Sequence, residues 1–464
     1  MRLVIAGGKV VNAFGSQVAD VVVEEGRITG IVSPRRIAGD VDVVVDAKDC
    51  LVVPGGVDPH VHFDSPTQKA IVADDFYSGT LAAAFGGTTT VIDFVFQLGD
   101  STISDALAGG MRRAKGKAIV DYGFHAVITN SDEKTLAELP EVLANGVSSC
   151  KLYMAYESRG LFMRDDNIFK VMRAAGKHGI LVMLHAENGP LTQLFVQEAL
   201  LRGDTGPQWH PKTRPPLTEV EAIYRGISIA ELAGVPVYFV HVSTNGGASH
   251  IRDARMRGMA VYGETCPHYL LLDESVYDAA GFEAAKWVLT PPIRDLSNQS
   301  ALWKFLKSRD LSTVATDHCP FCFEGGKDIG ISDFSRIPNG GPGVEHRLSL
   351  LFDAGVTTGK ISVERWVELT STAPARLFGL SHAKGHISVG ADADLVIFDP
   401  NMVSEITSAT SHSAVDYSMY EGRKLTGGVR SVISRGEVIV DQGTCNATPG
   451  RGRYVPRLAH EPLP

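Results

Sequence analysis

Eight apolar segments of strand length recur through the middle of the chain, and a helical pattern separates each from the next. They lie at 51–59, 88–95, 121–128, 148–154, 180–185, 236–241, 259–264 and 312–317. Between them, residues 166–178 carry apolar side chains at helical spacing, and residues 217–233 lie between Pro216 and Gly234. Strands alternating with helices over about 330 residues predict an α/β protein with a (β/α)8 (TIM) barrel. A doubly wound sheet is the alternative, but no glycine-rich phosphate loop follows the first strand.

Both ends of the chain consist instead of short strands separated by Gly, Asp and Asn. Neither end is long enough to bury a core alone, so we expect the two to pair in one small β-sandwich. The expected division is a first sandwich half at 1–54, a barrel at 55–385, a second sandwich half at 386–448 and a tail at 449–464. The tail is expected to be extended and to contact a neighbouring subunit.

Composition excludes several classes of protein. The 464 residues are 44% hydrophobic and carry a net charge of −9, which indicates a globular chain without a basic surface for nucleic acid or anionic lipid. No long uncharged apolar window predicts a membrane span, and the first residues do not read as a secretory signal. Six cysteines are too few for a disulfide framework. We therefore expect a cytoplasmic protein that binds neither nucleic acid nor membrane.

Side chains that can bind a metal ion follow several of the predicted strands. His60 and His62 end the first strand, and residues two apart in an extended segment point to the same side. His185, His241 and Asp317 end the fifth, sixth and eighth strands, at the face of a barrel where active sites are built. One such histidine alone is usually a core or surface residue. The ordered set suits zinc or a similar divalent ion, and holds two ions only if another anion bridges them.

The chain resembles the amidohydrolase superfamily, and within it the hydantoinase/dihydropyrimidinase family of cyclic amidohydrolases. The resemblance covers about 51–347, and the flanking sandwich halves fit as well. It rests on GGVDPHVHFD, DDFYSGTLAAAFGGTTTVIDF, SSCKLYMAYE, LVMLHAENG, HVST, GETCPHYL, TPPIRD, VATDHCPF and IPNGGPGVEHR. It implies a hydrolase that opens dihydropyrimidine or 5-substituted hydantoin rings to N-carbamoyl amino acids, and a homo-oligomer, specifically a tetramer.

The same resemblance implies that Lys151 is N6-carboxylysine and bridges two divalent metal ions, with Zn2+ the expected ion. One ion would be held by His60, His62 and Asp317, and the other by His185 and His241. The chemistry is reasonable because a lysine carbamate is an anion, whereas an ammonium group with a pKa of about 10.4 cannot bind a cation. An ordinary lysine with a packed stem is the alternative.

The implied reaction is attack of a metal-bridging hydroxide on a ring amide carbon. Asp317 would accept the proton and return it to the leaving nitrogen, although pure metal ligation is an alternative. Tyr156 would donate a hydrogen bond to the developing oxyanion, unless it only closes the barrel mouth. Thr290 and Asn339 match positions that grip the ring imide, or are plain turn residues.

Two further segments bear on the choice of ring. Residues 161–163 are apolar and either cover the exocyclic substituent or pack on their own helix. Residues 64–68 are more polar than the family's usual version, which argues against bulky aromatic hydantoins. Tyr156 favours hydantoins and dihydropyrimidines over allantoin, and Asp64 would repel the carboxylate of dihydroorotate. An allantoinase or cyclic-imide hydrolase stays open as the alternative. A non-catalytic scaffold of the family is disfavoured because every ligand position is retained.

Overall fold

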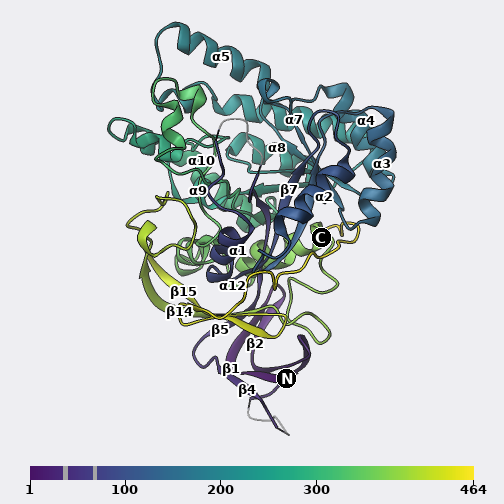
Figure 1. Cartoon of the computed structure of the whole chain (residues 1–464), viewed down its shortest axis with the longest axis vertical. Helices are drawn as coiled ribbons and strands as arrows, with labels where there is room; N and C mark the ends of the chain where they lie inside the picture. Colours follow the sequence, from purple (N-terminus) through teal and green to yellow (C-terminus); the bar gives the residue numbers. More distant parts are fainter. Residues whose placement is uncertain (35–39, 66–69, 464) are drawn as a thin grey trace.

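The computed structural model describes residues 1–34, 40–65 and 70–463, and a parallel barrel forms its centre (Figure 1). Within these residues the barrel sheet has eight strands that pair in sequence order. They are β6 (Gly56–Val61), β7 (Thr88–Phe96), β8 (Asp121–Val127), β9 (Ser149–Tyr153), β10 (Leu181–His185), β11 (Val237–Phe239), β12 (Val261–Thr265) and β13 (Thr313–Val314). A parallel bridge between Val61 and His318 joins the first strand to the segment after the last. The barrel prediction is confirmed.

Helices connect these strands, and three more helices follow the last strand. They are α1 (Phe76–Phe85), α2 (Ile103–Ala114), α3 (Glu133–Ala144), α4 (Asp165–Gly176), α5 (Gly189–Leu201), α6 (Trp209–Lys212), α7 (Pro216–Ala233), α8 (Asn245–Met256), α9 (Pro267–Leu271), α10 (Leu296–Ser308), α11 (Arg347–Leu351), α12 (Val363–Val367) and α13 (Ala373–Leu377). Two of them show how the sequence sets the boundaries. Four apolar residues of α4 are buried, at the spacing of one helical face. Pro216 begins α7, and Gly234 ends it with a φ of 68°.

Shorter helical segments lie in the loops and extend two of the helices. The 3-10 segments are η1 (Glu157–Arg159), η2 (Glu274–Asp278), η3 (Glu283–Trp287), η4 (Lys327–Gly330), η5 (Phe334–Arg336) and η8 (Ser408–Thr410). The π-helical segments η6 (Phe352–Thr357) and η7 (Glu368–Thr372) continue α11 and α12. No helix in the described part of the chain is both long and apolar enough to cross a membrane.

The two ends of the chain form a second, mostly antiparallel sheet. Its strands are β1 (Arg2–Asn12), β2 (Gly15–Glu24), β3 (Arg27–Val32), β4 (Val43–Asp46), β5 (Leu51–Pro54), β14 (Leu395–Glu405), β15 (Lys424–Ser434), β16 (Glu437–Asp441) and β17 (Thr444–Cys445). The two ends meet where β5 pairs with β14 and with β1. Residues from both ends share one hydrophobic core, including Val21, Val52 and Ile397. The predicted pairing of the ends in a small β-sandwich is therefore confirmed.

One predicted strand is divided between the two sheets. Residues 51–54 belong to the terminal sheet as β5, and the first barrel strand begins at Gly56. The division of the chain at residues 54, 385 and 448 stays a prediction. The described part of the tail lies against its own barrel. Tyr454 forms an isolated parallel β-bridge with Tyr122, and the buried Arg457 donates a hydrogen bond of 2.9 Å to Ser149 Oγ.

Apolar side chains fill the inside of the barrel below its carboxyl-terminal face. Ile92, Leu181, Met183 and Tyr238 are fully buried and form one cluster with Phe378. Such a packed interior leaves only the ends of the strands and the following loops for a polar site. The fold therefore confines the site to that face.

Candidate metal centre and active-site cavity

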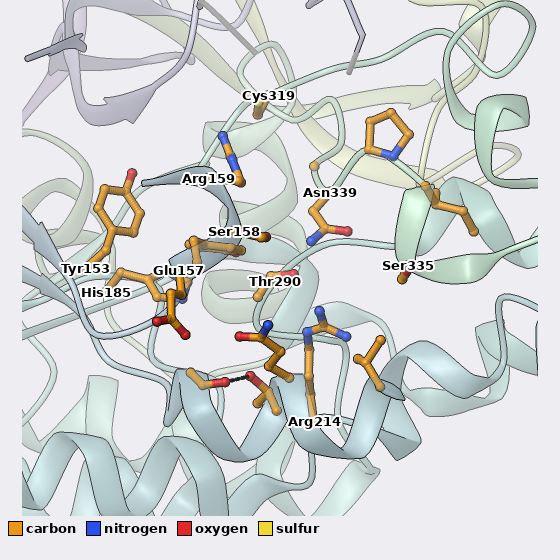
Figure 2. A pocket seen from close by; sticks show the side chains of 18 of the residues that line it. Tyr153, Glu157, Ser158, Arg159, His185, Arg214, Thr290, Cys319, Ser335 and Asn339 are labelled. Atoms are coloured by element: carbon orange, nitrogen blue, oxygen red, sulfur yellow. Dashed lines mark hydrogen bonds between the residues drawn. The ribbon is translucent and has the colours of Figure 1, made fainter. Parts of the chain in front are cut away.

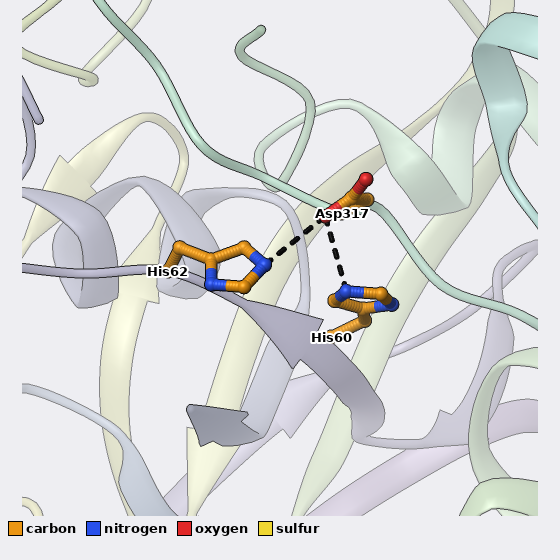
Figure 3. Close-up of side chains that lie close together, drawn as sticks. All are labelled: His60, His62 and Asp317. Atoms are coloured by element: carbon orange, nitrogen blue, oxygen red, sulfur yellow. Dashed lines mark hydrogen bonds and ion pairs between the residues drawn. The ribbon is translucent and has the colours of Figure 1, made fainter. Parts of the chain in front are cut away.

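Three predicted ligands converge at the seam where the barrel closes (Figure 3). Asp317 Oδ1 lies 3.1 Å from His60 Nε2 and 3.2 Å from His62 Nε2. The ligand atoms of the three residues all lie within 4.8 Å of one another. Two imidazoles and a carboxylate at this spacing are ligand types that suit zinc and similar divalent ions.

The other predicted ligands lie beside this group. Lys151 Nζ is 3.0 Å from His60 Nε2, and His185 Nδ1 is 2.8 Å from His241 Nε2. The ring centroids of His60 and His241 are 5.6 Å apart, which places the two pairs next to each other. The structure thus brings together all six residues that the sequence analysis assigned to metal binding.

Two buried carboxylates hold the outer nitrogens of the histidines. Glu264 Oε1 lies 2.7 Å from His60 Nδ1, and Glu187 Oε2 lies 2.9 Å from His185 Nε2. When each outer nitrogen carries the proton, the inner nitrogen presents a lone pair to the metal position. The donor set therefore fits divalent metal ions, with one carboxylate orienting a histidine in each half of the site.

Neither of these carboxylates was predicted from the sequence. Glu187 stands two residues after His185, where an extended segment directs it to the same side. Glu264 is an acidic residue within a fully buried strand, and such a residue needs a partner. These two signals were present in the sequence, but only the fold identifies the partner of Glu264.

Lys151 lies in an environment that disfavours its charged form. Its side chain is buried on β9, with Nζ 4.4 Å from the ring centroid of Phe94 and 5.0 Å from that of Tyr153. Burial lowers the pKa of Lys151 to about 8, although Asp317 and Glu264 act in the opposite direction. A neutral amine, which carbamate formation requires, is therefore accessible close to neutral pH.

A cavity of about 460 Å³ opens beside the metal-binding groups (Figure 2). Tyr156, Thr290 and Asn339 all line it, together with Lys151 and Asp317. Burial raises the pKa of Tyr156, so its hydroxyl keeps its proton and can donate a hydrogen bond. Thr290 Oγ1 is buried, and the Thr290 side chain lies beside that of Tyr156. The three residues predicted to contact substrate thus share one cavity with five of the six predicted ligands.

The loop after β9 follows one of the two alternatives that the sequence left open. Leu161 and Met163 are buried in the protein core, and none of residues 161–163 lines the cavity. The segment η1 lines it instead, through Glu157, Ser158 and Arg159. Of the two alternatives for 161–163, the structure therefore favours packing over a cover for the substituent.

The proposed repulsion by Asp64 is also wrong. Asp64 Oδ2 lies 3.1 Å from Lys117 Nζ, and Asp64 does not line the cavity. Ser65 does line it, while Pro66, Thr67 and Gln68 fall outside the described residues. A charge that is paired with a lysine away from the cavity cannot select against an anionic substrate.

A barrel with convergent histidines, a lysine and an aspartate at its carboxyl-terminal face defines a class of metal-dependent hydrolases, and the sequence model of the amidohydrolase family matches residues 51–439. The chain belongs to this family, and to its hydantoinase/dihydropyrimidinase branch.

Similar proteins extend over the whole chain. The D-hydantoinase of Streptomyces coelicolor is 44% identical, over 98% of each chain. The D-hydantoinase of Geobacillus stearothermophilus is also 44% identical, over 100% of this chain and 98% of the relative. The crystal structure of dihydropyrimidinase from Brevibacillus agri superposes with a TM-score of 0.98 at 42% identity and covers 100% of both chains.

Proposed function

We propose that this protein is a metal-dependent hydrolase that opens cyclic amides, namely 5-substituted hydantoins or dihydropyrimidines, to N-carbamoyl amino acids. The observation that carries the proposal is the convergence of His60, His62, Lys151, His185, His241 and Asp317 beside the cavity that Tyr156, Thr290 and Asn339 line. The names of the similar proteins agree with this reaction class.

We propose that the six ligand residues hold two divalent ions, with Zn2+ the expected ion and Lys151 as N6-carboxylysine between them. Carboxylation joins the Lys151 nitrogen to the carbon of CO2 with loss of one proton from nitrogen. The product is a carboxylate-like group, which suits a divalent cation better than an amine does. Ions bound there would polarise the ring carbonyl and lower the pKa of a water molecule.

The remaining steps fall to side chains of this chain. Although burial raises it, contact with His60 and His62 lowers the pKa of Asp317 well below its usual value. Asp317 is therefore ionised at neutral pH and can accept a proton from water, then return it to the ring nitrogen as that nitrogen leaves. Tyr156 is placed to donate a hydrogen bond to the carbonyl oxygen as it gains charge, and Thr290 and Asn339 to hold the imide.

Parallel turnover assays test this function. Protein loaded with zinc or manganese in bicarbonate is assayed with dihydrouracil, a 5-substituted hydantoin, allantoin and dihydroorotate. Preference for either of the first two supports the proposal. Preference for allantoin or dihydroorotate would assign a different ring. Absence of turnover by protein that binds two metal ions would exclude all four rings.

We further propose a cytoplasmic homotetramer. All six cysteines are free thiols, which fits a reducing compartment. Leu191, Leu194 and Leu201 of α5 are exposed by 43%, 46% and 88%, and an apolar stripe of this kind fits a subunit contact. Light scattering of the purified protein measures the oligomeric state directly.

A further inference from the structure

Two guanidinium groups line the cavity, and neither takes part in the chemistry proposed above. Arg159 ends η1, and Arg214 lies just before α7. Within the described residues neither forms an ion pair with a carboxylate, whereas Arg164, Arg202 and Arg225 each do. Two unpaired cations in one cavity point to an anionic ligand group.

Arg214 is held in place but keeps hydrogen-bonding capacity. Its Nη1 lies 3.2 Å from His210 Nδ1 and 3.3 Å from Thr213 Oγ1, and these bonds leave Nη2 and Nε for another acceptor. Its carbonyl oxygen accepts a hydrogen bond from Arg294. Burial and the charge of Arg214 keep the pKa of His210 well below its usual value, so a neutral histidine contacts the guanidinium. The charge of Arg214 is therefore not cancelled by these contacts.

Arg159 lies against the tyrosine proposed to contact the reacting carbonyl. Its Cζ is 5.1 Å from the ring centroid of Tyr156. Figure 2 shows Arg214 reaching from the helical side of the cavity toward Thr290 and Asn339, with Arg159 beyond Ser158. The two arginines thus flank the space next to the proposed ring position.

Few described acidic groups oppose these charges. Asp64 is paired with Lys117. Glu187 accepts a hydrogen bond from His185 and does not line the cavity. Burial raises the pKa of Glu187, but the contact with His185 and the charge of Arg214 lower it, so this carboxylate partly offsets the charge of Arg214. Glu157 lines the cavity as an exposed carboxylate and offsets one positive charge. Apart from the groups assigned to metal binding, the described lining residues leave one net positive charge.

We propose that Arg159 and Arg214 form a subsite for an anionic exocyclic substituent, so that the enzyme prefers rings whose side chain ends in a carboxylate. The inference rests on the proposed ring-opening function and names its substrate class. It also accounts for the loop after β9, which presents a polar, arginine-bearing segment to the cavity.

The test compares two substrates of nearly equal shape: 5-(2-carboxyethyl)hydantoin and its neutral amide, 5-(2-carbamoylethyl)hydantoin. At low salt, the wild-type kcat/KM for the acid is expected to exceed that for the amide by about tenfold or more, because charge-assisted hydrogen bonds are roughly twice as strong as neutral ones. Arg214→Gln and Arg159→Gln should each reduce this ratio toward one, and high salt should reduce it too. Glu157→Gln should increase it.

Arg164→Gln is the matched control, since Arg164 pairs with Asp166 and does not line the cavity. Its ratio should equal that of the wild type. A wild-type ratio of one or less overturns the subsite while leaving hydantoin hydrolysis intact. Equal losses on both substrates in the Arg214 and Arg159 variants would also overturn it, because they indicate a structural role. Hydrolysis of neither substrate by metal-loaded protein would refute the proposed function itself.

Discussion

Three lysines are buried in the described part of the chain, and two of them, Lys151 and Lys384, lie in opposite regions of the molecule. Lys151 lies at the active-site face, and Lys384 lies where the barrel meets the terminal sheet. Lys384 Nζ lies 2.9 Å from Asp121, 3.2 Å from Asp392 and 2.6 Å from Asp394. Lys151 Nζ instead lies 3.0 Å from a histidine nitrogen and forms no ion pair with a carboxylate in the described part of the chain. Despite burial, the three carboxylates raise the pKa of Lys384, whereas burial lowers that of Lys151 to about 8.

The difference shows what makes a buried lysine reactive. Asp121, Asp392 and Asp394 have carboxylate oxygens spaced closely enough to hold a metal ion, but the ammonium of Lys384 already occupies their centre. Lys384 is thus a structural cation. Lys151 lacks such partners, so its amine is available for carboxylation. Acidic surroundings, more than burial, separate the two.

Replacement of Lys151 should have the largest effect. Lys151→Met keeps the volume of the side chain but removes the proposed bridging group. We expect kcat/KM to fall on the order of a thousandfold, about 4 kcal/mol in activation free energy, with loss of bound metal. Elemental analysis and turnover assays measure both. Lys170→Met, on the outer face of α4, is the control. Full metal content and activity in Lys151→Met would contradict the bridging role.

Replacement of Lys384 should reduce the stability of the protein and leave its metal content unchanged. Lys384→Met removes the ion-pair partner of the buried Asp394, while Asp121 keeps Arg435 and Asp392 keeps Arg27. This loss is expected to destabilise the protein by about 3–5 kcal/mol. Urea unfolding measures this loss, and metal content per folded molecule should stay at the wild-type level. An unaltered unfolding midpoint, or metal loss without destabilisation, would show that Lys384 is not a structural cation.

Lowering the pH should reduce the difference in unfolding free energy between the wild type and Lys384→Met. Burial opposes the shift, but Lys384 and Arg435 lower the pKa of Asp121. A lowered carboxyl pKa contributes stability that is present at neutral pH and is lost as the pH falls below about 4. Unfolding measured at pH 7 and at successively lower pH follows this window. If the difference in unfolding free energy grows as the pH falls, the ion pairs of Lys384 are not the source of the stability.

The same contrast explains which features the sequence could predict. Strand and helix positions follow from local periodicity, so the boundaries of α4 and α7 lie within two residues of the predicted ones. The pair His60 and His62 is local as well. The family resemblance supplied the role of Lys151, since no local pattern distinguishes it from Lys384.

Features that depend on contacts between distant segments escaped prediction. Glu264 and His60 are separated by 204 positions but lie 2.7 Å apart. The ion pair between Asp64 and Lys117 joins two distant segments of the chain, so it could not be predicted from the sequence. Without that partner, Asp64 was expected to repel an anionic substrate. The unpaired state of Arg159 and Arg214 likewise depends on the whole set of neighbours. Sequence patterns therefore identified the ligands better than the groups that surround them.

The two halves of the metal site allow a finer test. Glu187→Gln keeps the shape of the group that holds His185 but removes its charge. We expect metal affinity to fall by about 10–100-fold for one ion, since outer carboxylates tune the ligands they orient. Glu264→Gln, the matched variant, should weaken the other ion. Competition with a chelator resolves the two binding steps. Equal weakening of both steps by both variants would contradict the division into halves.

The smallest expected effect is the carboxylation of Lys151 in metal-free protein, but this signal is specific to that one side chain. Because burial lowers the pKa of Lys151 to about 8 from the ordinary 10.5, the neutral amine forms as the pH rises through about 8. Only that form attacks CO2, so a 13C carbamate signal at fixed dissolved 13CO2 should already appear at pH values around 8 and grow further as the pH rises. Lys151→Met should abolish this signal. A signal that rises only above pH 10 would indicate a solvated lysine and would remove the distinction drawn between Lys151 and ordinary lysines.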